Sequence, residues 1–342
     1  MHQKERFQNN YDFLRIFAAL CIIFFHSFAL LKDESNEPLV QFTNGRINFA
    51  FIGLSIFFCI SGYLIAKSAV RSPTVKNYLW KRLLRIQPLL ILACFLTIFL
   101  IGPFFTEFSF KHYFLDVHTY SYFRNVLPIF GLQFTLPGVF IHNVGDRGVN
   151  GSLWTLIAEE RLYILMTVTF LYRKDKARYL VFLIVLLNIV FVINRYFFYG
   201  EMISYLSGTA FFYSLLFLNS AALYLIKFDF SKKLVLTIVL SALCLCLGVA
   251  FNELNILYIF SIPVLVNSVA KIKGATNYFG KYGDFTYGTY VFSFPVQQAF
   301  ISKGMTDPYL LFLITLIVVC PLAVLSWNLV EKKFLKLKKF VK

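Results

Sequence analysis

Charged side chains are scarce in this chain: Asp, Glu, Lys and Arg together account for only 15% of its 342 residues. An average soluble domain carries roughly 25% of such residues. A soluble fold of this size also exposes too much surface to be covered by so few charges. The scarcity therefore excludes an ordinary cytosolic enzyme, a disordered chain and a nucleic-acid-binding module.

Cysteine is sparse as well, and the positions of the six cysteines argue against both a disulfide framework and a metal centre. All six lie in apolar runs, and Cys244 and Cys246 have no further cluster of Cys or His near them in the sequence. Structural zinc sites need such a second cluster at a short spacing. We interpret these cysteines as small hydrophobic residues, and we expect no metal.

Three familiar catalytic signatures are missing. The sequence contains no G-x-S-x-G nucleophile elbow, no H-E-x-x-H zinc motif and no glycine-rich loop of the kind that cradles phosphates. These absences exclude the hydrolases, metalloproteases and nucleotide-binding enzymes that depend on those motifs.

Long apolar runs dominate instead. Hydrophobic residues make up 58% of the chain and aromatic residues 19%, and the mean hydropathy is +0.69. A membrane-spanning helix needs about 20 consecutive apolar residues. About ten runs meet this need, and they predict an all-α, polytopic integral membrane protein. The predicted spans are 11–31, 47–66, 83–102, 153–172, 179–198, 204–226, 234–251, 254–270, 285–302 and 309–329.

The basic residues predict the orientation of these helices. With the N-terminus in the cytoplasm, 24 of the 33 Lys and Arg residues fall in cytoplasmic segments and only seven in external ones. Cytoplasmic loops of membrane proteins carry this excess of Lys and Arg. We therefore expect ten helices, both termini in the cytoplasm and one membrane-embedded domain over 1–342. The net charge of +16 then reflects orientation and not nucleic-acid binding.

One predicted external segment, 103–152, is much longer than the others. It is rich in Phe and Tyr, contains three prolines and carries little net charge. Its aromatic content argues against disorder, and long loops of this kind are often functional. We expect a cap or a partly re-entrant layer on the helix bundle.

Ionisable groups inside apolar spans are costly and mark candidate functional sites. His26 lies about 8 Å inward from the outer end of the first span, and Glu159 lies about 9 Å inward from the outer end of the fourth, at 1.5 Å per residue. The two side chains can therefore meet at one depth as a general base and its acidic partner. The alternative for His26 is a packing residue bonded to a nearby carbonyl group.

Glu160 and Arg161 follow Glu159 directly, and these neighbours face other sides of the helix. One of the two carboxylates is free to pair with an arginine, while the other orients or charges His26. The alternative, in which both acids serve structure alone, is the weaker one because two carboxylates in a hydrocarbon layer are expensive.

A basic pair lies at the cytoplasmic entrance of the third span. Arg82 and Arg85 are three residues apart and share a helix face, so their two guanidinium groups can hold phosphate. Ordinary anchoring of the helix is the alternative for this pair, and also for Asp12 and Arg15 at the start of the first span. Ser61, which precedes a glycine in the second span, serves helix packing or lines a ligand channel.

This combination suits transfer of an acyl group between the two sides of a membrane. A base removes a proton from an acceptor hydroxyl, while arginines at the cytoplasmic side hold a phosphorylated donor such as acyl-CoA. The acceptor then lies on or beyond the outer leaflet.

The order and spacing of these motifs resemble the acyltransferase-3 family of multi-pass bacterial membrane acyltransferases. The resemblance runs from residue 12 to residue 332. It is carried by Arg15 with His26, Phe57 to Leu64 (FFCISGYL), Arg82 with Arg85, Gly151 to Glu159 (GSLWTLIAE), Gly283 to Tyr290 (GDFTYGTY) with Phe294 to Val296, and Trp327 to Lys332 (WNLVEK).

The resemblance implies transfer of an acetyl group from cytosolic acetyl-CoA to a hydroxyl of a surface polysaccharide or its lipid-linked precursor, in the bacterial cytoplasmic membrane. It implies that His26 is the catalytic base and Glu159 its partner. It also implies that Arg82 and Arg85 bind the donor and that Arg15 is an essential basic group. We predict Arg15 and Ser61 as further donor-binding residues. Some relatives have a second histidine before the late Phe-Pro pair, where this chain has Ser293. We expect no fused extracytoplasmic domain.

Two rival functions remain open from the residues. A transporter or flippase of a polar or lipid-linked sugar would also carry charges within the membrane, although we see no inverted repeat or paired broken helices. A polymerase or ligase that uses lipid-linked sugars is the third hypothesis, and it would need no arginine-dependent binding of CoA.

Overall fold

The structure of the chain is a computed structural model that describes residues 9–170, 176–197 and 208–340. The regular secondary structure in these ranges is helical, and their one extended pairing is an isolated bridge between Thr106 and Val139. Apolar runs with few charges favour helices, because a helix forms its backbone hydrogen bonds within its own segment where water is absent.

The longer α-helices overlap the predicted apolar runs. The α-helices are α2 (Tyr11–Ala29), α3 (Pro38–Phe42), α4 (Phe49–Arg71), α5 (Val75–Leu96), α6 (Gly102–Phe105), α7 (Phe110–Leu115), α8 (Val117–Ser121), α9 (Trp154–Leu165), α10 (Lys176–Phe197), α11 (Thr209–Leu225), α12 (Leu234–Ala250), α13 (Tyr258–Val269), α14 (Thr286–Ile301), α15 (Pro308–Ser326) and α16 (Lys332–Leu335). Helices α3, α7, α8 and α16 lie outside the predicted runs.

Five helical stretches are long and apolar enough to cross a membrane by length and composition. Three shorter apolar helices accompany them, namely Thr209–Leu225, Leu234–Ala250 and Glu253–Val269. The all-helical membrane architecture is therefore confirmed, while the count of ten spans and the orientation stay predictions. Parts of three predicted spans, 171–172, 198 and 204–207, lie outside the described residues. The five long stretches are Tyr11–Ala29, Phe49–Arg71, Val75–Phe105, Arg178–Phe197 and Pro308–Phe340.

The chain forms two compact units. The first comprises Met1–Ala18, Phe51–Tyr78 and Leu162–Tyr282, and the second comprises Ala19–Ala50, Leu79–Arg161 and Gly283–Lys342. We call them unit 1 and unit 2.

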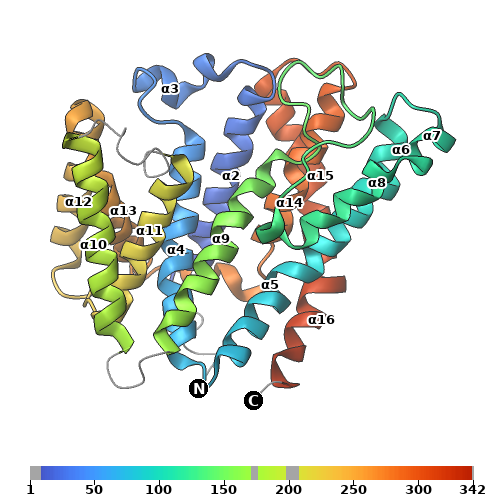
Figure 1. The fold of residues 1–342 in the computed structure, drawn as a ribbon. Helices are drawn as coiled ribbons and strands as arrows, with labels where there is room; N and C mark the ends of the chain where they lie inside the picture. The colour runs from blue at the N-terminus through green and yellow to red at the C-terminus, as the bar shows by residue number, and fades with distance from the viewer. Residues whose placement is uncertain (1–8, 171–175, 198–207, 341–342) are drawn as a thin grey trace. The chain divides into compact units, whose positions relative to one another are not determined.

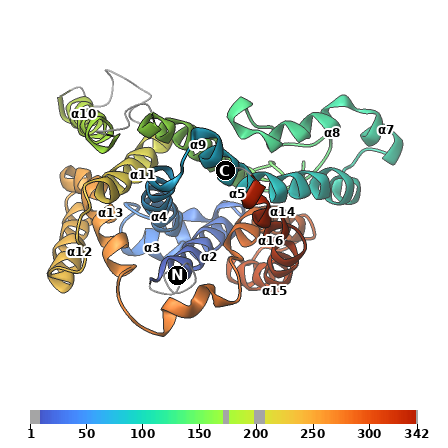
Figure 2. The ribbon, with the colours of Figure 1, turned by 90° about the horizontal axis from the view of Figure 1, so that it is seen from below.

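In unit 1, α13 packs against both α11 and α12, and α10 packs against α11 (Figure 2). Helix α4 approaches α11 closely at Gly62, where a Cβ atom would lie only 2.0 Å from the backbone oxygen of Phe217. Polar side chains also link α2, α13 and α11. Tyr11 donates to Asn267 (2.9 Å), and Asn267 donates to Ser220 (2.7 Å). Because glycine has no side chain, Gly62 permits the close approach of α4 to α11, as small residues do in other membrane helix pairs.

In unit 2, α14 and α15 form a closely packed pair joined by a short turn (Figure 1). Helix α5 continues through a π-helical turn, Thr97–Ile101, into α6. Helix α15 likewise continues through a π-helical turn, Trp327–Glu331, into α16. These continuations give unit 2 its two longest helical stretches.

The aromatic segment 103–152 is folded, as its composition predicts. Tyr113 and Tyr122 are fully buried in a cluster with Cys94 and Ile98 of the α5 stretch. The hydroxyl of Tyr113 donates to the carbonyl oxygen of Ile98 (2.9 Å), so its polar end is satisfied inside the cluster. Burial raises the pKa of the Tyr113 phenol well above its usual value. The segment therefore packs on the end of α5 through its own apolar core.

Candidate active site

His26 lies in the last turn of α2, in unit 2, and its imidazole is half-buried. The ring packs edge-on against the ring of Phe294 of α14, with 5.2 Å between the centroids. The imidazole nitrogens form no hydrogen bond with any other residue that the structure describes. The packing alternative, in which a nearby carbonyl holds the imidazole, therefore has no such carbonyl among the described residues.

Helix α14 is fastened to α2 on both sides of His26. The side-chain amide of Gln297 donates to the carbonyl oxygen of Ile23 (3.0 Å) and to the hydroxyl of Ser27 (2.8 Å). Ile23 lies three residues before His26 and shares its side of α2, whereas Ser27 follows His26 directly. These bonds fix the imidazole beside the middle of α14.

The loop that precedes α9 is held on α14 by side-chain amides. Gln298 donates to the carbonyl oxygen of Gly148 (2.7 Å) and accepts from Asn143 (2.7 Å). Asn150 donates to the carbonyl oxygen of Val291 (2.9 Å). A Cβ atom on Gly151 would lie 2.7 Å from the ring of Phe294, so this backbone passes directly over the ring that contacts His26.

This loop brings an acidic residue toward His26 that the sequence analysis did not single out. The Asp146 carboxylate acts electrostatically on the His26 imidazole. One of its oxygens accepts from the backbone N–H of Gly148 (2.7 Å). The other lies 3.0 Å from the Cβ position of Gly151, on the same side as Phe294. Asp146 is exposed, so water or a substrate can reach it.

Glu159 is half-buried in α9 and acts electrostatically on the buried hydroxyl of Tyr290. That hydroxyl also donates to the carbonyl oxygen of Ser152 (2.6 Å). Tyr290 lies one helical turn before Phe294 on α14, about 6 Å along the axis. His26 thus contacts Phe294 and Glu159 acts on Tyr290, one turn earlier on α14, and the pairing of His26 with Glu159 stays a prediction.

Glu160 has a different role. One carboxylate oxygen accepts from the side-chain amide of Gln87 (2.9 Å), and the other accepts from the backbone N–H of Ile129 (2.9 Å). Both oxygens therefore connect α5 and the segment 103–152 to α9. Of the two adjacent acids, Glu160 is the structural one.

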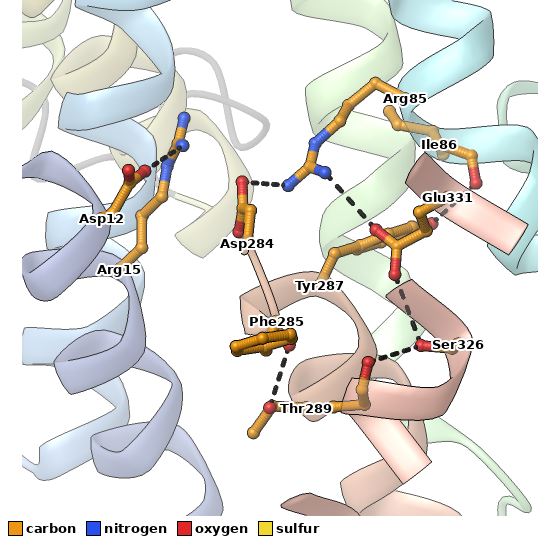
Figure 3. A network of polar contacts seen from close by, with 11 residues as sticks. Asp12, Arg15, Arg85, Ile86, Asp284, Phe285, Tyr287, Thr289, Ser326 and Glu331 are labelled. Atoms are coloured by element: carbon orange, nitrogen blue, oxygen red, sulfur yellow. Dashed lines mark hydrogen bonds and ion pairs between the residues drawn. The ribbon is translucent and has the colours of Figure 1, made fainter. Parts of the chain in front are cut away.

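Arg85 lies between two carboxylates of unit 2 (Figure 3). Its guanidinium contacts Asp284 at 2.6 Å and Glu331 at 3.4 Å, and its carbon lies 6.0 Å from the centroid of the Tyr287 ring. Ser326 donates a further hydrogen bond to Glu331 (3.4 Å). The sequence runs that carry Asp284 and Glu331 thus meet at this arginine.

Arg82 precedes Arg85 by one turn of α5 and is half-buried. The structure therefore places the predicted pair in one unit with His26 and Glu159. Arg15 and Ser61 belong to unit 1, where Arg15 forms an ion pair with Asp12 at 3.5 Å (Figure 3). Ser61 is half-buried beside the glycine at which α4 meets α11.

A metal centre has no ligand set in the part of the chain that the structure describes, since no group of three His, Cys, Asp or Glu side chains comes together there. The chemistry available near His26 is instead proton transfer. An imidazole that is half-exposed and not held by a hydrogen bond can accept a proton from a bound hydroxyl.

A family model described as an acyltransferase domain matches residues 8–328. The chain is 31% identical over 337 residues to an O-acetyl transferase of Shigella phage Sf6, and the match covers 96% of each chain. It is 27% identical over 352 residues to nodulation protein 10 of Rhizobium leguminosarum bv. viciae, with 97% of this chain and 94% of that protein covered. No solved structure matches the chain.

Proposed function

Because the chain belongs to the acyltransferase-3 family, we propose that it transfers an acetyl group from cytosolic acetyl-CoA to a hydroxyl of a surface polysaccharide or its lipid-linked precursor. The family supplies O-acyl transfer, and the position of His26 carries the proposal for this chain. Its imidazole stands beside α14 without a hydrogen bond to any described residue, which suits a base that binds its substrate.

In this proposal His26 takes the proton of the acceptor hydroxyl while the hydroxyl oxygen attacks the carbonyl carbon of the thioester. The new C–O bond replaces the C–S bond, and CoA leaves as a thiolate. The imidazolium returns its proton to that thiolate, so the base is regenerated. A carboxylate near the imidazole stabilises the positive charge that forms on it, and Glu159 is the predicted partner.

The donor would be held at the cytoplasmic side by Arg82 and Arg85, and the donor-binding roles of Arg15 and Ser61 stay predictions from the sequence. The ion pairs of Arg85 with Asp284 and Glu331 keep this guanidinium in place before a phosphate arrives. An arginine side chain that is already held in position loses little conformational entropy when its guanidinium group binds phosphate. The bias of basic residues supports a multi-pass arrangement in the bacterial cytoplasmic membrane with both termini inside.

The first test is His26→Ala in the source organism. We expect the acetyl esters of the surface polysaccharide to disappear while the amount of protein in the membrane is unchanged. The readout is mass spectrometry of the isolated polysaccharide. His142→Ala is the matched control, because His142 is an exposed histidine of the segment 103–152 that contacts Glu107 (3.1 Å). Normal acetylation in the His26 variant would remove His26 from the mechanism.

A second measurement separates transfer from transport. The purified protein, supplied with acetyl-CoA and a glycan acceptor, should release free CoA thiol. Movement of a sugar across vesicles without any release of thiol would instead support a transporter or flippase.

A further inference from the structure

Gln297 is completely buried in α14, and all of its donor capacity is used. Its Nε2 atom donates to the carbonyl oxygen of Ile23 (3.0 Å) and to the Ser27 hydroxyl (2.8 Å). The Ser27 hydroxyl gives its own proton to the same Ile23 oxygen (3.0 Å). Two donors thus converge on one backbone acceptor of α2.

This arrangement fixes which way the amide points. Turning the amide over would place its carbonyl oxygen against the Ile23 carbonyl oxygen, and two acceptors would face one another without a proton between them. The Nε2 atom therefore faces α2, and Oε1 points away from Ile23. No described residue donates a hydrogen bond to this Oε1 atom, although it is buried.

A buried acceptor without a donor destabilises the folded protein, because it loses its hydrogen bonds to water. Such groups are few in native proteins, and each one calls for an explanation. Gln298, the next residue, gives the contrast: its Oε1 accepts from Asn143 and its Nε2 donates to the Gly148 oxygen. Of two adjacent buried glutamines, one is saturated and the other keeps an open acceptor.

The open acceptor lies beside the candidate base. Its amide is anchored on Ile23 and Ser27, which flank His26 in the sequence and on the surface of α2. Phe294, one turn before Gln297 on α14, packs on the His26 imidazole at 5.2 Å. The candidate base and the amide that carries the open acceptor therefore lie where α2 and α14 pack together.

We propose that Gln297 determines acceptor specificity: its Oε1 atom accepts a hydrogen bond from a sugar hydroxyl that neighbours the one deprotonated by His26. The inference rests on the proposed function. The reacting hydroxyl gives its only proton to the imidazole, so a second hydroxyl is the donor that Oε1 can receive. Sugars carry such hydroxyls on adjacent carbons. The thioester carbonyl and the phosphates of a CoA donor offer acceptors, which this oxygen does not bind.

A site built around a hydrogen bond to a substrate hydroxyl discriminates strongly against molecules that lack it, because its own buried polar group is then unpaired. Gln297 would thus select the acceptor and leave the affinity for the acyl donor unchanged. This separation of the two substrates makes the inference testable.

The experiment uses the full-length purified protein and the Gln297→Met variant, which keeps the length of the side chain. The donor is radiolabelled acetyl-CoA. The acceptor is the envelope polysaccharide and glycolipid fraction of the source organism after removal of its esters with mild alkali. We expect kcat/KM for the acceptor to fall at least about tenfold, which corresponds to about 1.4 kcal/mol of lost binding. The KM for acetyl-CoA should stay within about twofold.

Ser27→Ala is the matched control. It removes one partner of Nε2 and leaves Oε1 in place, so we expect the acceptor kinetics to stay within about threefold of the wild type. If Gln297→Met yields no folded protein, Gln297→Asn replaces it. That variant retracts the amide oxygen by one carbon, and it should raise the KM for the acceptor in the same way.

The outcomes separate the two proposals. Equal acceptor kinetics in the Gln297 variant and the wild type would overturn the role of Gln297 and leave the proposed function intact. Equal losses in the Gln297 and Ser27 variants would show a packing role and also overturn it. A raised KM for acetyl-CoA alone would assign the oxygen to an amide N–H of the donor, against the inference. A wild-type protein that labels no acceptor would overturn the proposed function itself, and this inference with it.

Discussion

The His26 imidazole has two carboxylates in its neighbourhood, and single-residue geometry separates them. Asp146 acts on the imidazole itself, from an exposed loop over α14. Glu159 acts on Tyr290, one turn further along the same helix. A carboxylate beside the base stabilises the imidazolium that forms during proton transfer. We therefore expect different effects on the rate of acetyl transfer when each acid is replaced by its amide.

We expect Asp146→Asn to lower kcat about tenfold, because the imidazolium loses about 1.4 kcal/mol of stabilisation in the transition state. The asparagine oxygen can still accept from the Gly148 N–H, so the loop keeps its shape. The measurement is the rate of acetyl transfer to saturating acceptor. Glu159→Gln, assayed beside it, tests the predicted partner.

Asp116→Asn is the control for this comparison. Asp116 is another acid of the segment 103–152, and its carboxylate accepts from the N–H of His118 (2.8 Å) at the start of α8. We expect its rate to match the wild type. A loss in the Glu159 variant with none in the Asp146 variant would give the partner role to Glu159 alone.

The site residues identified from the sequence are ionisable groups in or at the ends of apolar runs, where a charge costs free energy. His26 and Glu159 stand out because ionisable groups are rare inside membrane spans, and Arg82 and Arg85 stand out because their spacing puts them on one helix face. Asp146 gave no such signal, since an acid in a polar loop is ordinary. Gln297 gave none either, because only the structure shows that its amide nitrogen is bonded while its oxygen is not.

At the scale of elements, the clearest constraint is the contact of α4 with α11 in unit 1. The FFCISGYL stretch offered helix packing and a ligand channel as alternatives. The structure gives Gly62 a packing role, since its Cβ position lies 2.0 Å from the Phe217 backbone oxygen. A backbone atom cannot move aside as a flexible side chain can. Ser61 precedes Gly62 and is half-buried, and its part in binding the donor stays a proposal.

We expect Gly62→Ala to destabilise the protein by about 1–3 kcal/mol, the range for overpacking a tight interface. The measurement is the midpoint of thermal unfolding of the purified protein in detergent. Gly274→Ala is the control, because a Cβ atom there meets nothing within 4 Å. Its backbone is extended, with φ of 175°, so alanine introduces no strain. An unchanged midpoint in the Gly62 variant would mean that α4 and α11 are not in close contact.

Apolar length and the positions of polar residues were enough to predict the helices. Each predicted span overlaps an α-helix of the described ranges, although the ends differ and parts of three spans lie outside those ranges. The π-helical turns Thr97–Ile101 and Trp327–Glu331 were not predicted, because both lie within runs that read as ordinary helix. The second of these turns positions Glu331 to meet Arg85. Such a contact depends on residues almost 250 positions apart, which helix periodicity does not reveal.

At the scale of the whole molecule, the two compact units divide the predicted site residues. His26, Glu159, Arg82 and Arg85 lie in unit 2, together with Asp146 and Gln297. The single membrane-embedded domain over 1–342 stays a prediction. Each unit is assembled from three separate stretches of the chain. Helix α2 crosses from one unit to the other between Ala18 and Ala19.

Orientation is the property of the whole molecule on which the direction of acyl transfer depends. In unit 2, the loop before α9 and the end of α16 lie at opposite ends (Figure 1). The bias of basic residues predicts that the loop faces outward and the tail faces the cytoplasm. The side chain of His142 in that loop is 77% exposed, and Lys339 in the tail is exposed as well.

We expect a cysteine placed by His142→Cys to react with a membrane-impermeant maleimide in spheroplasts, and one placed by Lys339→Cys to react only after the membrane is opened. The exposed native thiols of Cys246 and Cys320 are first replaced by alanine. Labelling of both positions after lysis is the control for accessibility. Reaction at Lys339 in intact spheroplasts would put the tail outside and contradict the predicted orientation. The predicted cytoplasmic entrance for the donor at Arg82 and Arg85 would then be wrong as well.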